Sequence, residues 1–132
     1  MSNIQTYYHG GDSRYELWYD DLLWLTPEDY YAKQYAIEVD EPVIWEVIID
    51  EDKLNDIALF DLDGYTRGSY FDAYKPSKKT LKLAYEDGYN CYYMEYDSFN
   101  ASGLCLFFDK SPIVSVRKLT KEEYDLIDEN DY

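Results

Sequence analysis

The stretch LLWLTPEDYYAKQYA, residues 22–36, joins two secondary-structure signals end to end. Its first five residues are an apolar run, which predicts a buried strand. Thr26 and the proline after it form an N-cap and first-turn pair, and two acidic residues follow where a helix favours negative charge. The predicted helix places Tyr31, Ala32 and Tyr35 on one face. A strand that leads directly into a helix with an aromatic face therefore anchors the expected fold.

The other elements predict an α+β fold with a split, mostly antiparallel β-sheet and few short helices. The β-branched run VIWEVII predicts a central strand, and the pair Gly10-Gly11 is expected to break the first strand after His9. Residues 50–75 give no clear signal. A later helix is expected at 77–87, with Gly88 following its end, and a short helix is expected to start at the capping box of Thr120 and Glu123. The expected strands are 4–9, 22–26, 43–49, 89–96, 103–109 and 112–118.

The chain has 132 residues, which is enough for one domain with its own core, and we expect residues 1–132 to form a single domain. Its net charge is −16, but 46% of its residues are hydrophobic and 17 are tyrosines, which disordered acidic chains lack. No run approaches the roughly 18 apolar residues of a membrane span, and the start has no basic and apolar regions of a secretory signal. We therefore expect a cytoplasmic protein, acting in a host cell, that contacts no membrane.

The acidic charge is uneven along the chain. Residues 1–66 hold 16 acidic and 3 basic side chains, so most of the net charge of −16 lies in the first half. This charge disfavours direct contact with nucleic-acid phosphates. Two interpretations stay open: the acidic half is a solvated face, or it mimics nucleic acid and meets a basic partner such as a nucleic-acid-binding protein or complex.

The two cysteines, Cys91 and Cys105, lie in apolar, aromatic stretches and are expected to be buried thiols in a reducing cytosol. A zinc site would need two further soft ligands, and His9 is the only histidine. We therefore expect no metal site.

Two pairs of residues in the first third of the chain could carry a binding site. His9-Gly10 stands at the end of the first predicted strand, where glycine lets another group approach the backbone. Trp24 stands on the strand that leads into the helix carrying Tyr35, so the two rings could clamp a flat ring between them. Each residue also has a plain structural interpretation, because core aromatics and strand-end histidines are common.

At this point the chain resembles the ADP-ribosyltransferases of the diphtheria-toxin and poly-ADP-ribose-polymerase class. The likeness is carried by the order YYHGG, LLWLTPEDYYAKQYA, VIWEVII, GYNCYY and GLCLFFDKSPIVSV, over roughly residues 5–118. That class has a His-Gly strand end, a pair of tyrosines ten residues apart and a late carboxylate. The resemblance implies an ADP-ribosyltransferase-like fold that uses NAD as substrate without a G-x-G-x-x-G signature, which this chain lacks.

The resemblance also implies roles for five residues at NAD. His9 would hydrogen-bond the ribose beside nicotinamide, and Gly10 would offer its backbone to the nicotinamide amide. Trp24 stands where the family has its first tyrosine and Tyr35 where it has its second, so they would sandwich the nicotinamide. Tyr31 would join them from the same helix face.

The catalytic carboxylate departs from the family pattern. Family members often carry a glutamate at the start of the strand that here reads GLCLFFD, where this chain has Gly103 or Leu104. The nearest acids are Glu95 and Asp97. Small anti-CRISPR ADP-ribosyltransferases of phages, which this chain also resembles, take their acid from the equivalent loop. Glu95 and Asp97 are therefore the catalytic candidates, with a solvated surface role as the alternative; a carboxylate there would stabilise the positive charge that develops on the ribosyl carbon.

Two functions follow from these observations. The first is a small mono-ADP-ribosyltransferase that transfers ADP-ribose from NAD to a protein target, as a phage or bacterial effector that inhibits a defence complex such as CRISPR. The alternative is an acidic nucleic-acid mimic or inhibitor protein, which could stand on a catalytically degenerate ADP-ribosyltransferase fold. Dependence on NAD separates the two.

Overall fold

The computed structural model describes residues 3–15, 17, 21–37, 39–66, 77–96 and 101–127. These residues form an α+β fold with two antiparallel sheets of three strands each and a few short helices, which confirms the expected fold class. Sheet A has the strand order β1-β3-β6, made of Ile4–Asp12, Pro42–Asp50 and Ile113–Lys118. Sheet B has the order β2-β5-β4, made of Leu22–Leu25, Ala101–Phe107 and Cys91–Tyr96.

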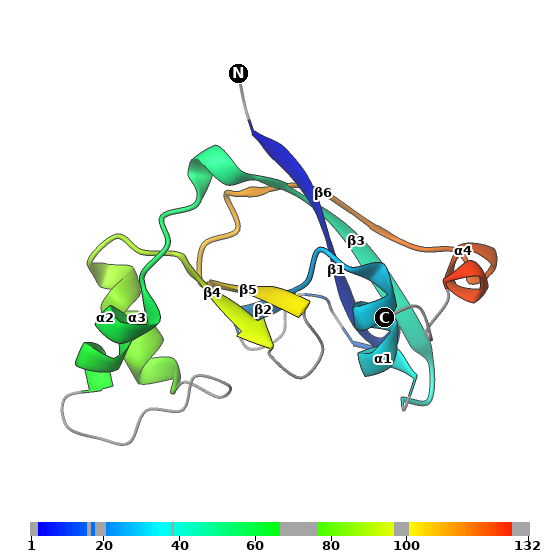
Figure 1. Cartoon of the computed structure of the whole chain (residues 1–132), viewed down its shortest axis with the longest axis horizontal. Coiled ribbons are helices and arrows are strands. Elements are labelled where there is room, and N and C mark those ends of the chain that lie inside the picture. Colours follow the sequence, from blue (N-terminus) through cyan, green and yellow to red (C-terminus); the bar gives the residue numbers. More distant parts are fainter. Residues whose placement is uncertain are drawn as a thin grey trace.

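The helices cover the outer faces of the two sheets (Figure 1). α1 packs on β1 and β3 of sheet A, and α4 contacts β3. α2 and α3 lie together beside sheet B. The helices are α1 (Asp29–Ala36), α2 (Leu59–Asp63), α3 (Lys78–Glu86) and α4 (Lys121–Leu126), with two 3₁₀ turns, η1 (Glu51–Lys53) and η2 (Gly64–Thr66). None of the described helices is long and apolar enough to cross a membrane.

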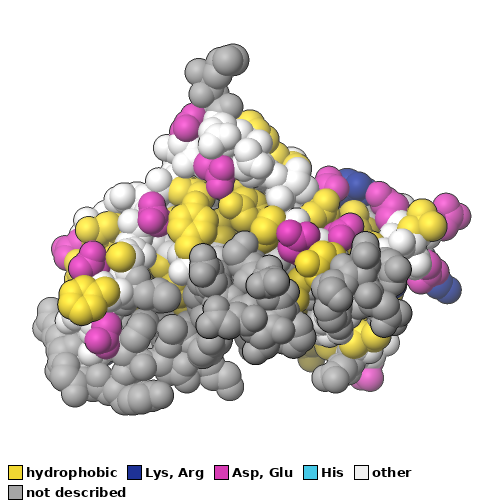
Figure 2. All heavy atoms as spheres, viewed as in Figure 1, with side chains coloured by type: hydrophobic (Ala, Val, Ile, Leu, Met, Phe, Trp, Pro, Cys, Tyr) yellow, Lys and Arg dark blue, Asp and Glu magenta, His cyan; other side chains and the backbone are white. Residues whose placement is uncertain are grey.

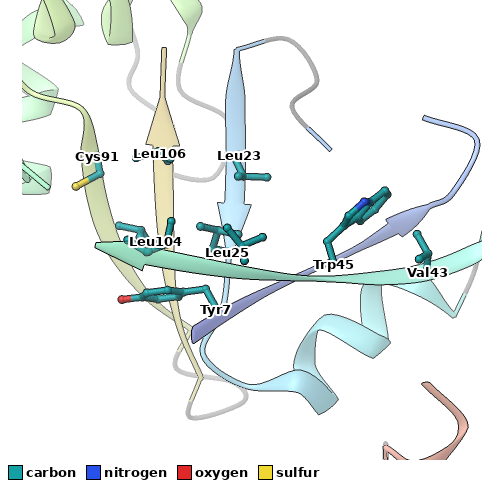
Figure 3. Close-up of a cluster of buried hydrophobic side chains, with 10 residues drawn as sticks. Tyr7, Leu23, Leu25, Val43, Trp45, Cys91, Leu104 and Leu106 are labelled. Atoms are coloured by element: carbon teal, nitrogen blue, oxygen red, sulfur yellow. The ribbon is translucent and has the colours of Figure 1, made fainter. Parts of the chain in front are cut away.

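The main core lies between the two sheets (Figure 3). It forms because alternate residues of a strand point to the same face, so β3 turns every second apolar side chain towards sheet B. Trp45 and Val47 of sheet A thus pack against the leucines of β2 and β5. This core contains Tyr7, Leu23, Leu25, Val43, Trp45, Val47, Ile49, Cys91, Leu104 and Leu106.

A second core lies on the other face of sheet B. Phe107 and Tyr92, both fully buried, face Leu81 of α3 and Leu62 of α2. Burial of two large aromatic side chains contributes on the order of several kcal/mol. Both cysteines are free thiols without solvent exposure, as the sequence predicts.

The two sheets meet at a single isolated bridge between β1 and the residue after β2. The N–H of Tyr8 donates to the carbonyl of Thr26 at 2.7 Å, and the N–H of Thr26 donates to the carbonyl of Tyr8 at 2.9 Å. Beyond this bridge the strands separate, because β1 pairs with β3 while β2 pairs with β5. The sheet is therefore split at Tyr8 and Thr26.

Several of the expected element boundaries are wrong. Gly10 and Gly11 do not break the first strand, because both pair with β3 and β1 continues to Asp12. Thr26 is not the helix N-cap; its backbone is used by the bridge to Tyr8, so α1 starts at Asp29 with Glu28 as N-cap. The strand expected at 89–96 starts two residues later, as Cys91–Tyr96. The strand expected at 103–109 both starts and ends two residues earlier, as Ala101–Phe107.

The helix signals of the second half are confirmed. Ser77 caps α3 by accepting a hydrogen bond from the N–H of Thr80, and Gly88 follows the helix with φ of 102°. The capping box of Thr120 and Glu123 opens α4. The unclear region 50–75 contains the short helix α2 between η1 and η2, which its sequence did not indicate.

Candidate functional site

A cavity of about 300 Å³ opens where the two sheets separate. Three elements enclose it: the middle of β1, the end of β2 with the residue that follows, and the inner face of α1. The lining residues are Tyr8, His9, Gly10, Trp24, Leu25, Thr26, Tyr31, Ala32 and Tyr35. All five residues that the sequence assigns to cofactor binding are among them, brought together from three segments of the chain, 8–10, 24–26 and 31–35.

The imidazole of His9 occupies the point of separation. The backbone N–H and carbonyl of Thr26 both bond to Tyr8 of β1. Because backbone groups two residues apart in a strand point to the same side, the carbonyl of Trp24 also points towards β1. His9 Nδ1 lies 2.6 Å from that carbonyl oxygen. A carbonyl can only accept, so Nδ1 carries the proton and donates it, and Nε2 of the neutral ring is an acceptor.

His9 is a neutral side chain at pH 7. Burial lowers its pKa below the ordinary value of 6.5, and the hydrogen bond to the Trp24 carbonyl opposes this only in part. The ring also lies against Trp45, with centroids 5.6 Å apart. No hydrogen bond from the described residues reaches Nε2, so the acceptor capacity of this nitrogen is unused within them.

Gly10 is required by the close approach of α1. A Cβ atom at this position would lie 1.8 Å from the carbonyl oxygen of Ala32 and 2.8 Å from its carbonyl carbon. The sequence expectation that a glycine here lets another group approach the backbone is therefore confirmed, with α1 as the group that approaches. Contact with a nicotinamide amide stays a prediction.

The walls of the cavity are aromatic and uncharged. Tyr31 and Tyr35 meet edge to face with ring centroids 5.2 Å apart, and their hydroxyl oxygens are 3.0 Å apart. Tyr31 is 5% exposed whereas Tyr35 is 54% exposed, so Tyr31 lies deep and Tyr35 stands at the opening. Trp24 is held by an edge contact to Tyr92, at 5.9 Å between centroids. Trp24 also packs against the second core. A clamp of Trp24 and Tyr35 on a flat ring stays a prediction.

The candidate carboxylates do not complete the cavity in the part of the chain that the structure describes. Asp97 lies outside the described residues. Glu95 is on the edge strand β4, opposite Ser102, at the end of sheet B that leads to Thr26; its side chain is outside the described part. Gly103 and Leu104, where the family glutamate is expected, lie on β5, the strand next to β2.

Four lining residues were not assigned to a ligand by the sequence: Tyr8, Leu25, Thr26 and Ala32. Leu25 and Ala32 carry the signal of ordinary core residues and gave no indication of a site. Tyr8 and Thr26 line the cavity because they form the bridge at which the sheets split, and no local pattern marks such a pairing.

The sequence and the structure were also compared with known proteins. No protein-family model, curated protein or solved structure matches this chain. Within the described residues no group of three histidine, cysteine or acidic side chains is placed to hold a metal ion.

Proposed function

We propose that this protein is a small mono-ADP-ribosyltransferase that transfers ADP-ribose from NAD to a protein target. One observation carries the proposal. The five residues that the resemblance assigns to NAD line a single cavity at the split between the sheets, namely His9, Gly10, Trp24, Tyr31 and Tyr35.

The chemistry of the cavity fits the nicotinamide end of NAD. The nicotinamide ring of NAD is flat and positively charged, and aromatic faces attract such a cation. None of the nine lining residues is positively charged at neutral pH, so no lining side chain repels the positive ring. A volume of about 300 Å³ is at the small end of ligand pockets, which accommodates one end of NAD and leaves the adenosine outside.

His9 supports this orientation of the substrate. Its Nε2 is an acceptor in the neutral ring, and a ribose hydroxyl next to the nicotinamide is a matching donor. In the proposed reaction the bond between the nicotinamide nitrogen and C1′ of the ribose breaks, and nicotinamide leaves with the electron pair. A nucleophile of the target then bonds to C1′ and releases its proton to solvent. A carboxylate from Glu95 or Asp97 is proposed to stabilise the charge on the ribosyl carbon.

The charge of the chain favours a basic target. Figure 2 shows acidic side chains distributed over the described part of one face, among exposed apolar side chains. With a net charge of −16, the protein attracts a basic surface and repels nucleic acid. We therefore propose a basic nucleic-acid-binding protein or complex as target, and a phage or bacterial effector that inhibits a defence complex such as CRISPR as the biological role.

A second function is favoured by one observation. No carboxylate is among the lining residues in the described part of the chain. An ADP-ribosyltransferase-like fold without a catalytic acid would bind NAD or a basic partner and act as an acidic inhibitor without chemistry.

Incubation of the purified protein with NAD and a bacterial host lysate tests the proposal. We expect release of nicotinamide, and a mass gain of one ADP-ribose on a specific protein. Both should be lost in His9→Ala and kept in Gln5→Ala, which changes an exposed residue of the same strand. Asp97→Ala should lower the rate and leave NAD affinity unchanged.

The other outcomes separate the alternatives. NAD binding by titration without any turnover would favour the inhibitor on a degenerate fold. No turnover and no NAD binding would refute the transferase and leave the acidic inhibitor, whose partner binding should weaken steeply with added salt.

A further inference from the structure

Lys33 is a buried lysine on the helix that forms one wall of the cavity. Its side chain is mostly enclosed, with the residue 8% exposed. Lysine is almost never buried unless its ammonium group is paired. Lys33 Nζ donates to the carbonyl oxygens of Tyr124 at 3.0 Å and of Ile127 at 2.9 Å, and it lies 4.6 Å from the centre of the Tyr124 ring.

These partners are the carbonyls at the end of α4. Tyr124 is in its last turn and Ile127 is its C-cap. The carbonyl of Tyr124 also accepts a hydrogen bond from the N–H of Ile127 at 3.2 Å, so Lys33 is a further donor to it. Carbonyl oxygens at the end of a helix carry partial negative charge, so an ammonium group is a matching partner there. Lys33 therefore fastens α1 to the end of α4, more than ninety residues later in the chain.

α4 is fastened to sheet A on its other side. Arg117 of β6 donates to both carboxylate oxygens of Glu123 at 2.8 Å, and also to Glu46 of β3 at 3.2 and 3.3 Å. Glu46 in turn stands opposite Tyr8, which lines the cavity. α4 thus connects to the cavity twice, through Lys33 to α1 and through Arg117 to the β3 residue beside Tyr8.

We infer that α4 is a positioning element of the ligand cavity and that Lys33 is the positioning residue through which it acts. The hydrogen bonds of Lys33 go to α4 and not to a lining side chain of the cavity, but its neighbour Ala32 lies directly on Gly10, and Tyr31 and Tyr35 are on the same helix. A release of α4 would let α1 shift on β1 and would widen the space between the aromatic walls. This inference rests on the proposed function for the identity of the ligand.

Lys33→Met tests the inference, because it keeps the apolar stem and removes the donor. We expect KM for NAD to rise about tenfold with kcat within twofold of wild type, since two hydrogen bonds hold α1 in place. Amide hydrogen exchange should accelerate about tenfold in α1 and stay unchanged in α3. The matched control is Lys82→Met on α3, which lies over Tyr85 and Phe108 on the far side of sheet B and should change neither value.

Unchanged KM and unchanged exchange in α1 would overturn the inference. If the wild-type protein binds no NAD, the proposed function is refuted. The amide hydrogen exchange of α1 in Lys33→Met then decides by itself whether α4 positions α1. Glu123→Gln is the second variant, for the case that Lys33→Met does not fold. It loosens α4 from Arg117 at an exposed site, and a rise of KM of about threefold with unchanged kcat is expected.

Discussion

Replacement of Gly10 by alanine should displace α1 from β1. The added Cβ would lie 1.8 Å from the carbonyl oxygen of Ala32, and real Cβ atoms essentially never come within 3.0 Å of another heavy atom. α1 would therefore have to retreat by about 1.2 Å, the difference of these two distances. The obstacle is main chain on both sides, so no side-chain rotation relieves it.

The cost of this change follows from the packing of α1. Ala32 and Ala36 have no solvent exposure and Tyr31 has 5%, so a retreat of the helix opens space under three buried side chains. Overpacking of a close contact costs about 3 kcal/mol in the free energy of unfolding, which for a domain of this size lowers Tm by roughly 10 °C. The cavity widens as well, so affinity for NAD should be lost.

Urea denaturation followed by circular dichroism measures this effect. The control is Gly64→Ala, because a Cβ at Gly64 meets nothing within 4 Å and its backbone is helical. That variant should be as stable as wild type or slightly more stable. A free energy of unfolding for Gly10→Ala within about 0.5 kcal/mol of wild type would refute the proposed contact between α1 and β1.

Three further predictions depend on titrating groups. Affinity for NAD should stay constant down to pH 6.5 and fall only as the pH drops through the lowered pKa of His9, because protonated Nε2 cannot accept; calorimetric titration at decreasing pH, over the range in which the protein stays folded, checks this, and a fall in affinity that begins above pH 6.5 would contradict it. His9 has a higher pKa in the unfolded chain than in the folded protein, so it binds a proton more readily when unfolded. The free energy of unfolding should therefore decrease as the pH falls below 6.5. Burial raises the pKa of Cys91 and of Cys105 to about 12, so a thiol reagent at pH 8 should label them only after unfolding; rapid labelling of the native protein would be inconsistent with their burial. The hydrogen bonds from Arg117 lower the pKa of Glu123 to about 2, so the stability difference between wild type and Glu123→Gln should be full above pH 4.5 and vanish as pH falls towards 2, measured by urea denaturation at each pH.

The local part of the site could be predicted from the sequence because it depends on neighbours in the chain. The strand followed by a helix in residues 22–36 brings Trp24 and Tyr35 to the same region, and spacing alone puts Tyr31 on the inner helix face. The capping box of Thr120 and Glu123 was predicted for the same reason, since the capping oxygen and the N–H that it accepts from are three residues apart.

The remaining part of the site depends on pairings between distant segments. Nothing near Tyr8 or Thr26 in the sequence shows that their backbones form an isolated bridge between β1 and the residue after β2. Gly10 looked like a strand breaker because its own chain neighbours allow a turn, whereas β3 supplies the partner that keeps it in a strand. No sequence pattern indicates that Lys33 is buried, because the carbonyls that enclose it come from α4.

The sequence by itself determined the class of fold, the elements with strong periodicity and caps, and the two residue pairs that could carry a binding site. Those properties arise from interactions over a few residues. Only the tertiary structure decided that the sheet splits at Tyr8 and Thr26 and that His9 Nδ1 donates to the carbonyl of Trp24. It also decided that α1 packs on Gly10 and that Lys33 of α1 donates to the carbonyls at the end of α4. The physical reason is that an unsatisfied backbone carbonyl and a close helix contact are created only when distant segments meet.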